Sequence, residues 1–427
     1  MESYMAITGH FIDQNTFKFC SILIQCAGFA GHHTGEKIAA ELRQVVSSGA
    51  ISDKINFIVS DNASNMTSAA RILEWPHYGC YAHKLNLIVQ AAVTDASISC
   101  TIAKVQKTVG HFKRSAIAKE KLLRYQATAQ NIAQPKSLLL SVPTRWNSTY
   151  FMLKRFSELQ EALRAPIPKL NSDLPVIPTE EWNCIEQICE ILQPFEEVTK
   201  IMSAENYLTA SKAIVLTAGL ITMCEEQLNR QFCAAVKTLI TTLKMGLRGR
   251  FGKIERTKEI AICALLDPRF KQHAFEDQIA MLWAKEMVSE KMKICAAHTE
   301  TSTATATVPS SPSTVTPTSV CSLWGRFDNK VATSYQPRTT DEKCKEELDM
   351  YISEIVIPRT ECPMQWWKER KTIYPILSQI FIQNCNIVVT SVPCERAFYT
   401  ISYTISERRT RLTTSKVEKI MFLNANN

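Results

Sequence analysis

The sequence of 427 residues is poor in glycine and has no long apolar run. It contains 12 glycines and none of the patterns G-x-x-x-x-G-K-[ST], G-x-G-x-x-G or G-x-S-x-G. A phosphate-cradling loop or a nucleophile elbow is therefore not predicted. No apolar segment approaches the roughly twenty residues that a membrane-spanning helix needs, and the first residues do not resemble a secretory signal. We therefore expect no membrane partner.

Closely spaced cysteine pairs are also missing, although the chain holds 15 cysteines. No two of them have the C-x-x-C spacing that is typical of zinc sites and redox motifs. Cysteines scattered singly through a large chain favour reduced thiols in an intracellular compartment over a disulfide framework.

Neither sign of charge dominates, because 49 Lys and Arg residues face 41 Asp and Glu residues, for a net charge of +8. This mild excess permits an anionic partner such as nucleic acid, and an ordinary solvated surface explains it equally well. The length is sufficient for two or three domains, and the hydrophobic fraction of 45% is that of a globular protein.

The N-terminal segment predicts a β-hairpin. Residues 5–12 and 17–26 are rich in β-prone side chains. Residues 13–15, Asp-Gln-Asn, separate the two runs and suit a turn.

A helix and a further strand are predicted next. Ile38, Leu42 and Val46 recur on one helical face, and Thr34 precedes them as a suitable N-cap. Residues 55–60 then form a nearly continuous apolar run, which is typical of a strand buried on both faces.

Asp61 stands directly after this predicted strand. In open α/β sheets, functional residues gather at the carboxyl ends of strands, so this aspartate is a candidate site residue. An aspartate after a strand is also a common turn or helix-capping residue. The local pattern leaves both roles open.

Much of the rest of the chain has helical periodicity, in residues 87–112 and in residues 150–298. Two apolar stripes lie in the second range, with Pro194 expected to kink the later one; they are Leu153, Phe156, Leu159 and Leu163, and Trp182, Ile185, Ile188, Leu192 and Phe195. Residues 297–320 change to Thr, Ser, Ala and Pro, which predicts a flexible linker.

The C-terminal tail predicts an amphipathic helix. Ser415 and Glu418 have the spacing of a reciprocal capping box. An apolar stripe follows on one face, formed by Val417, Ile420 and Met421 and widened by Phe422 and Leu423. Such a stripe is buried either against its own domain or against a partner.

Five blocks near the C-terminus occur in a fixed order: Met364-Gln365-Trp366-Trp367-Lys368, Tyr374-Pro375-Ile376-Leu377, Ser391-Val392-Pro393-x-Glu395-Arg396-x-Phe398, Arg409-x-Arg411-Leu412 and Phe422-Leu423-Asn424. In order and spacing they resemble the C-terminal dimerisation region of hAT-family transposases and of their domesticated relatives, the BED-type zinc-finger proteins. The segment from Ser60 to Met66 resembles a further block of the same family, which holds the second catalytic aspartate.

The resemblance implies an α/β fold with a large all-α insertion. It consists of a ribonuclease-H-like catalytic core, whose N-terminal strand is missing here, and the hAT dimerisation region. The expected domains are 1–146 for the N-terminal part of the core, 147–296 for the helical insertion, 297–325 for the Ser/Thr-rich flexible linker and 326–427 for the C-terminal part of the core with the dimerisation region.

In this resemblance Asp61 corresponds to the second catalytic aspartate and Glu395 to the distant catalytic glutamate. Such carboxylates hold two Mg²⁺ or Mn²⁺ ions that activate the attacking oxygen and stabilise the leaving one. The first aspartate of the family would lie on a strand before Glu2. Because two carboxylates without the third hold metal poorly, we expect an incomplete remnant of the site, no cofactor and no transposase activity.

Two further motifs have alternative explanations. Cys80-x-x-His83 resembles the family's C-x-x-H element, which organises the active site and nearby DNA, but packing on a helix explains it equally and zinc is disfavoured without a second ligand pair. Arg145-Trp146 resembles the family's R-W block. Arg145 could then contact a phosphate and Trp146 could stack on a base, whereas an isolated pair of this kind favours core packing of the indole.

The resemblance also assigns a set of dimerisation residues: Trp366, Trp367, Arg396, Phe398, Arg411, Leu412, Val417, Ile420, Met421, Phe422 and Leu423. The sequence therefore predicts a transposase-derived, catalytically inactive protein of the nucleus. It would form a homodimer or pair with a related hAT-type chain, and would bind DNA weakly. The alternatives are a truncated form of an active DDE-type transposase and a helical scaffold that binds only proteins.

Overall fold

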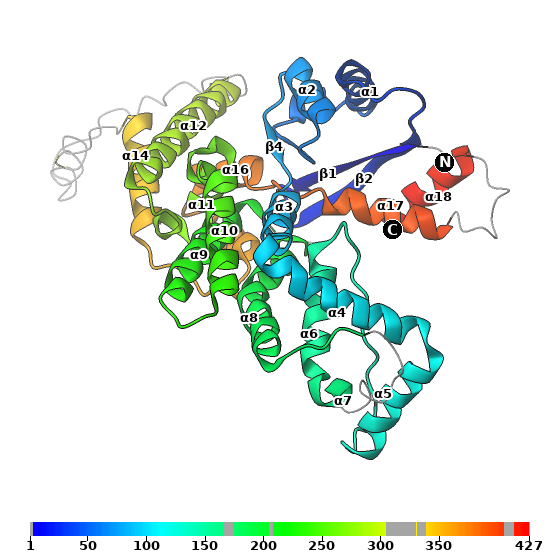
Figure 1. Cartoon of the computed structure of the whole chain (residues 1–427). Helices are drawn as coiled ribbons and strands as arrows, with labels where there is room; N and C mark the ends of the chain where they lie inside the picture. Colours follow the sequence, from blue (N-terminus) through cyan, green and yellow to red (C-terminus); the bar gives the residue numbers. More distant parts are fainter. Residues whose placement is uncertain are drawn as a thin grey trace, which may run out of the picture. The chain divides into compact units, whose positions relative to one another are not determined.

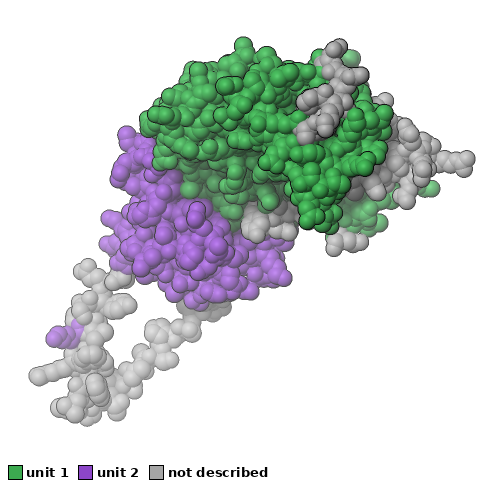
Figure 2. Space-filling view, turned by 60° about the horizontal axis from the view of Figure 1, so that its bottom comes forward, with its two compact units in different colours: residues 1–10, 21–254, 387–427 green, residues 11–20, 255–386 purple. Residues whose placement is uncertain are grey.

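The computed structural model describes residues 3–164, 174–204, 208–304, 330, 339–404 and 414–426. The chain divides into two compact units, shown in different colours in Figure 2. Unit 1 comprises residues 1–10, 21–254 and 387–427, and unit 2 comprises residues 11–20 and 255–386. In the described part of the chain no single helix is long and apolar enough to cross a membrane, and only the bent pair α3 (Tyr81–Val93) and α4 (Ala96–Arg114) meets that test jointly.

The predicted N-terminal hairpin is confirmed by strands β1 (Tyr4–Ile12) and β2 (Phe19–Gly28), which form a two-stranded sheet. Its turn is held by Asp13, whose Oδ1 accepts a hydrogen bond from the backbone N–H of Thr16 at 2.7 Å. An aspartate that bonds the backbone a few residues ahead is a common way to fix a turn.

The helix and strand predicted after the hairpin are present, although the strand is shorter than expected. Helix α1 (Gly35–Ser48) begins after Thr34, whose side chain accepts from the backbone N–H of Lys37, as predicted. Strand β3 (Ile58–Ser60) has 3 residues and is half-buried at Ile58, so the expected strand over 55–60, buried on both faces, was wrong in extent and in burial. It pairs in parallel with β4 (His77–Gly79), beyond helix α2 (Ser64–Leu73).

The hairpin of unit 1 lies between two layers of helices (Figure 1). On one face, Met5 and Ile7 of β1 pack with Ile58 of β3 against a cluster built from α1 and α2. On the other face, Leu23 and Cys26 of β2 pack against Ala397 and Met421. These last two belong to helices α17 (Val392–Thr404) and α18 (Thr414–Asn426).

The described strands form two separate two-stranded sheets, β1-β2 and β3-β4. Every described strand is therefore an edge strand with one hydrogen-bonded neighbour. The chain is mostly helical, and a continuous ribonuclease-H-like sheet, which the sequence predicted, is not formed by these strands.

The central part of unit 1 is helical, as the periodicity predicted, but the range 87–112 is broken by a sharp bend of 90° where Asp95 caps α4. Both predicted apolar stripes are buried. Phe156 of the first stripe stacks on Trp182 of the second, with their ring centres 4.7 Å apart. Further helices are α5 (Ala116–Thr128), α6 (Trp146–Glu158), α7 (Gln160–Arg164), α8 (Thr179–Met202), α9 (Ala210–Leu228) and α10 (Ala234–Phe251).

Unit 2 is built around stacked aromatic rings. Its helices are α11 (Lys258–Leu265), α12 (Gln278–Ala304), α14 (Thr340–Ser353), α15 (Pro363–Arg370) and α16 (Pro375–Asn384). Trp367 is completely buried, stacks on Phe381 and donates its indole N–H to the carbonyl of Leu266 at 3.0 Å. Helix α12 extends to Ala304, so the linker predicted from residue 297 begins inside it, and residues 305–325 lie outside the described residues.

The segment that follows α11, residues 267–271, contains three buried charged side chains. Asp267 accepts hydrogen bonds from the guanidinium of Arg269 at 2.8 and 2.6 Å, and both side chains are buried. Lys271 is also buried and donates to the carbonyls of Tyr351 and Glu354, each at 2.6 Å. Because these buried charges have partners, their desolvation is offset.

Replacing Trp367 with alanine should destabilise unit 2 strongly. The change removes a fully buried ring and leaves the carbonyl of Leu266 without its donor, so we expect a loss of about 3–5 kcal/mol in the free energy of unfolding. Urea unfolding followed by circular dichroism measures it. The control Ile355→Ala, at a side chain that is 86% exposed, should change stability by less than about 0.5 kcal/mol; equal effects of the two changes would contradict the assignment of Trp367 to the core.

Candidate functional site

Asp61 lies at the carboxyl end of β3 and is exposed. Its Oδ1 accepts a hydrogen bond from the backbone N–H of Ala63 at 3.3 Å, in the turn that leads into α2. The neighbouring Ser60 hydroxyl lies 2.9 Å from Nε2 of His77 on β4. The structure therefore gives Asp61 a local turn contact at the strand end where the sequence placed it.

Glu395 lies in the first turn of α17 and is also exposed. Its Oε1 accepts from the hydroxyl of Ser391 at 3.3 Å, and its backbone N–H donates to the carbonyl of Ser391 at 3.1 Å. Within the described residues, no hydrogen bond joins Glu395 to Asp61.

The side chain of Cys80 connects these two regions. Its sulfur accepts from the backbone N–H of Ser391 at 3.3 Å and from that of His83 at 3.4 Å, and its own N–H donates to the carbonyl of Ser60 at 2.6 Å. Cys80 is completely buried at the start of α3, so its thiol packs inside the protein and has no surface for DNA. His83 is half-buried on the same helix.

Two polar residues of β1 near Cys394, Thr8 and His10, were missed at the sequence level. The Thr8 hydroxyl on β1 lies 3.2 Å from Nε2 of His10 and 3.4 Å from the sulfur of Cys394 on α17. Burial lowers the pKa of His10 from 6.5 to about 4 and raises the pKa of the Cys394 thiol. Their period-two spacing on a strand was the available signal for Thr8 and His10, but nothing local indicates the contact with Cys394.

The donor set does not fit the pair of divalent cations that the resemblance implies. Within the described residues, no group of three or more His, Cys, Asp or Glu side chains could hold a metal ion together. Two-metal chemistry needs shared carboxylates around both ions. We therefore derive no cleavage step through Asp61 and Glu395.

Trp146 is a core residue, which is the alternative that an isolated Arg-Trp pair favours. Its side chain is 2% exposed and lies 6.2 Å from the ring of Tyr150, and its backbone N–H donates to Oδ1 of Asn86. An indole in this position offers no free face to a nucleic-acid base. Arg145, the residue before α6, is exposed and remains a candidate phosphate contact.

The predicted dimerisation residues fall into different environments. Trp366, Trp367 and Met421 are buried within the chain, and the Arg396 guanidinium donates to the carbonyl of Ser203. Phe398 is 37%, Phe422 50% and Leu423 60% exposed, whereas Ile420 is half-buried. Arg411 and Leu412 lie outside the described residues, and the side chain of Val417 is likewise not described.

Side chains of helix α18 hydrogen-bond to backbone groups of strand β2, where the backbone of a neighbouring strand would bond in a wider sheet. The amide of Asn426 accepts from the N–H of Leu23 at 2.9 Å and donates to its carbonyl at 3.0 Å. Glu418, predicted to cap its own helix together with Ser415, accepts from the N–H of Gly28 at 3.1 Å, and the side chain of Ser415 is not described. Both backbone groups of Leu23 are thereby paired, as they would be in a wider sheet.

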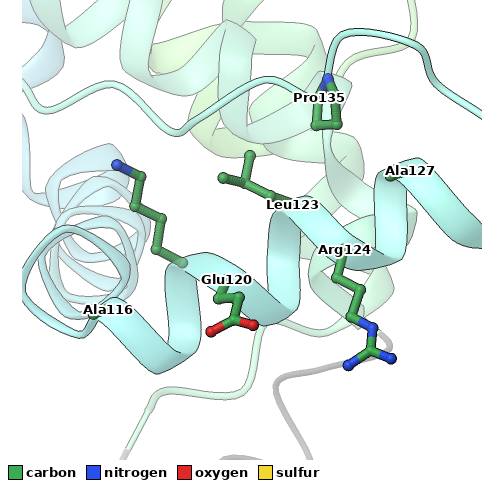
Figure 3. Close-up of a pocket in the computed structure, with 7 residues that line it drawn as sticks. Ala116, Glu120, Leu123, Arg124, Ala127 and Pro135 are labelled. Atoms are coloured by element: carbon green, nitrogen blue, oxygen red, sulfur yellow. The ribbon is translucent and has the colours of Figure 1, made fainter.

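A pocket of about 530 Å³ lies along α5, lined by Ala116, Lys119, Glu120, Leu123, Arg124, Ala127 and Pro135 (Figure 3). In this view Leu123 lies on the same side of α5 as Pro135, whereas Glu120 and Arg124 extend from the opposite side. None of the residues predicted as functional lines it, so we assign it no role.

Three family models match the chain. Residues 1–76 match the ZBED1 RNase-like domain, residues 78–191 the ZBED1 RNase-like helical domain and residues 347–427 the hAT family C-terminal dimerisation region. This chain is a relative of the hAT transposases and the ZBED proteins. The RNase-like match covers β1 to α2 with Asp61, and the dimerisation match covers α15 to α18 with Glu395.

Curated relatives agree with this assignment. The chain is 26% identical over 457 residues to a putative AC transposase of Zea mays, which covers 98% of this chain and 54% of the relative. It is 23% identical over 440 residues to zinc finger BED domain-containing protein 4 of Homo sapiens, covering 99% and 36%. The DAYSLEEPER protein of Arabidopsis thaliana, also named a zinc finger BED domain-containing protein, is 25% identical over 306 residues, covering 70% and 42%. The chain therefore spans about half or less of the length of these relatives.

Changes at Trp146 separate a core role from a DNA contact. Trp146→Ala should lower the free energy of unfolding by about 3–5 kcal/mol because it empties a buried site. Trp146→Leu keeps an apolar filler without an aromatic face and should leave DNA affinity unchanged in an anisotropy titration. Phe151→Ala, at a ring on the same helix that is 41% exposed, is the control for stability. Loss of DNA affinity in Trp146→Leu with normal stability would instead support base stacking.

The free energy of unfolding should fall as the pH decreases from 6.5 to about 4, because of His10. In the unfolded chain the imidazole binds a proton near pH 6.5, but in the folded chain only near pH 4. Between these values the unfolded state binds more protons, so the folded state loses stability as the pH falls. Relative to His10→Gln, we expect the wild-type chain to lose roughly 2–3 kcal/mol across this window. A pH-independent difference between the two chains would contradict the buried neutral imidazole.

Proposed function

We propose that this chain is a non-catalytic, transposase-derived protein that self-associates through α17 and α18 and binds DNA in the nucleus. The observation that carries the proposal is the division of the C-terminal helices into an inner and an outer face. The inner face is Ala397 and Met421, buried against β2, and the outer face carries Phe398, Tyr399, Phe422 and Leu423.

The outer face has the composition of an association surface. Phe398 and Tyr399 are 37% and 74% exposed directly after Ala397, and Phe422 and Leu423 are 50% and 60% exposed directly after Met421. Large apolar side chains that flank a docked core in this way are favourably buried when a second surface covers them. The occupant we propose is a second copy of this chain or a related hAT-type chain, because the dimerisation family model covers both helices.

The buried members of the predicted set support this surface indirectly. Met421 fixes α18 on the hairpin, and the bonds from Asn426 and Glu418 hold the same helix at two further points. An interface on a helix that is already held loses less conformational freedom on association. Trp366 and Trp367 stabilise unit 2 and make no part of the proposed contact.

DNA binding is the second part of the proposal. The net charge of +8 and the exposed Arg145 are compatible with phosphate contacts, and the relatives carry the names transposase and zinc finger protein. Phosphate contacts of this kind are sequence-independent and weaken as salt rises. The same relationship supports the nuclear location that we propose.

The absence of catalysis is the third part. Asp61 is occupied in a turn and Glu395 bonds Ser391, and among the described residues neither shares a metal-binding cluster with a third ligand. The ancestral requirement for Mg²⁺ or Mn²⁺ would accordingly be lost.

Charges placed on the outer face of α18 should prevent self-association. In the double variant Phe422→Glu, Leu423→Glu, two carboxylates would have to be buried at the interface. The free-energy cost of removing them from water exceeds the stabilisation that the contact provides. We expect sedimentation velocity to show a dimer for the wild-type chain and a monomer for the double variant at the same concentration.

The control for this experiment is Ile117→Glu, which changes a side chain on α5 that is 66% exposed and lies outside the matched dimerisation region. It should remain dimeric. A double variant that sediments like the wild-type chain, or a wild-type chain that is monomeric at all concentrations, would refute the proposed interface.

The chain should neither nick nor transfer terminal-repeat DNA in the presence of Mg²⁺ or Mn²⁺. Gel assays with labelled DNA measure this directly, and Asp61→Asn provides the control for contaminating nuclease. A metal-dependent cut by the wild-type chain that disappears in Asp61→Asn would overturn the non-catalytic assignment and favour an active DDE-type transposase.

A further inference from the structure

Lys84 occupies a distinctive position in the first turn of α3. Its ammonium group lies 3.8 Å from the centre of the Tyr78 ring on β4 and 5.9 Å from that of Phe251 at the end of α10. Lys84 itself is half-buried. Two aromatic faces thus hold the cation in one place, next to the end of β4.

Helices α3 and α10 pack closely, and Phe251, whose ring lies near Lys84, directly follows Arg250 on α10. A Cβ atom on Gly246 would lie 2.8 Å from Cγ2 of Ile88, so only glycine permits this helix spacing. Lys84 is one turn before Ile88, Arg250 is one turn after Gly246, and the Lys84–Phe251 contact shows that the start of α3 meets the end of α10, so both cations lie at the same end of this helix pair. The rings of Tyr81 and Phe251 stack 4.5 Å apart at this end of the pair.

Neither cation has a carboxylate partner within the described residues. On the same helix, by contrast, Arg248 forms an ion pair with Glu225. Arg250 is exposed, and the ammonium group of Lys84 lies over the ring of Tyr78. Two like charges in one place repel each other unless an anion joins them.

The electrostatics of the surrounding groups agree with this geometry. The pKa of Lys84 is lowered by burial and further by the charge of Arg250, although Cys80 acts in the opposite direction. The pKa of His77 is lowered by burial and by the charge of Lys84, and Asp61 raises it. Lys84 therefore lies within electrostatic reach of both Arg250 and His77, and His77 lies within reach of Asp61.

We propose that Lys84 and Arg250 together bind one backbone phosphate of duplex DNA. Lysine supplies a point charge fixed over the ring of Tyr78, and arginine supplies a planar fork of donors that matches two phosphate oxygens. The contact would position DNA without reading its sequence, because phosphates carry no base information. It deepens the proposed function and rests on the DNA binding proposed above.

The salt dependence of DNA binding tests this pair. Fluorescence anisotropy with a labelled duplex gives the slope of log K against log salt between about 50 and 200 mM. The double variant Lys84→Gln with Arg250→Gln loses one neutralised phosphate, so we expect the slope to fall in magnitude by about 0.9 and the affinity at low salt to fall about tenfold. Because both side chains share one phosphate, the double variant should lose less slope than two independent contacts would.

Two controls keep the test specific. Arg248→Gln removes a cation that is already paired with Glu225, so its slope should equal that of the wild-type chain. Lys84→Arg keeps the positive charge, so its DNA affinity and salt slope should stay close to those of the wild-type chain. Thermal unfolding of each variant checks that the fold is intact.

The outcomes separate the two proposals. If the wild-type chain binds duplex DNA and the double variant has the same slope, the assignment of Lys84 and Arg250 is overturned while DNA binding stands. If the wild-type chain does not bind duplex DNA even at low salt, DNA binding itself is overturned, and the assignment of Lys84 and Arg250 is overturned with it.

Discussion

The organisation of unit 1 depends on a short buried segment, Ile387–Ser391, that enters it from the C-terminal part of the chain. The carbonyl of Val389 accepts from the N–H of Tyr81 at 2.8 Å, and its N–H donates to the Thr209 hydroxyl at 3.0 Å. The N–H of Ser391 donates to the sulfur of Cys80. Because these backbone groups are buried, each missing bond would be costly. The segment thereby sets the start of α17 and places α17 and α18 on the hairpin.

This arrangement revises the roles of the residues that the family resemblance identified as candidate site residues. Cys80 joins the end of β3 to the start of α17 from inside the protein, so its role is to hold the framework. Asp61 and Glu395 lie at the surface of that framework in local bonds with their own turns. The side chains that we propose meet a partner are of a different kind, namely the exposed outer face of α17 and α18 and the cations Lys84 and Arg250. We therefore propose a role in binding rather than in catalysis.

Sequence reasoning succeeded where a short-range pattern determines the structure. The hairpin, the helix capped by Thr34 and the buried apolar stripes follow from periodicity and capping, which act over a few residues. It failed where contacts between segments far apart in the chain determine the structure. The paired amide of Asn426 on Leu23 joins residues 403 positions apart, and no local pattern indicates it. Trp146 was ambiguous for the same reason, because its burial depends on neighbours such as Asn86. Arg250 was missed because its place at the same end of the helix pair as Lys84 depends on how α3 packs on α10.

The central claim is that the outer face of α17 and α18 is covered by a second chain. Hydroxyl-radical footprinting of the intact protein at increasing concentration tests it most directly, because it reports the solvent exposure of individual side chains. The account predicts that oxidation of Phe398, Tyr399, Phe422 and Leu423 decreases as the protein associates, whereas Phe151, which is 41% exposed on α6, is oxidised equally throughout. Unchanged oxidation of these four side chains in a sample that has become dimeric would show that the chains meet elsewhere and would contradict the account.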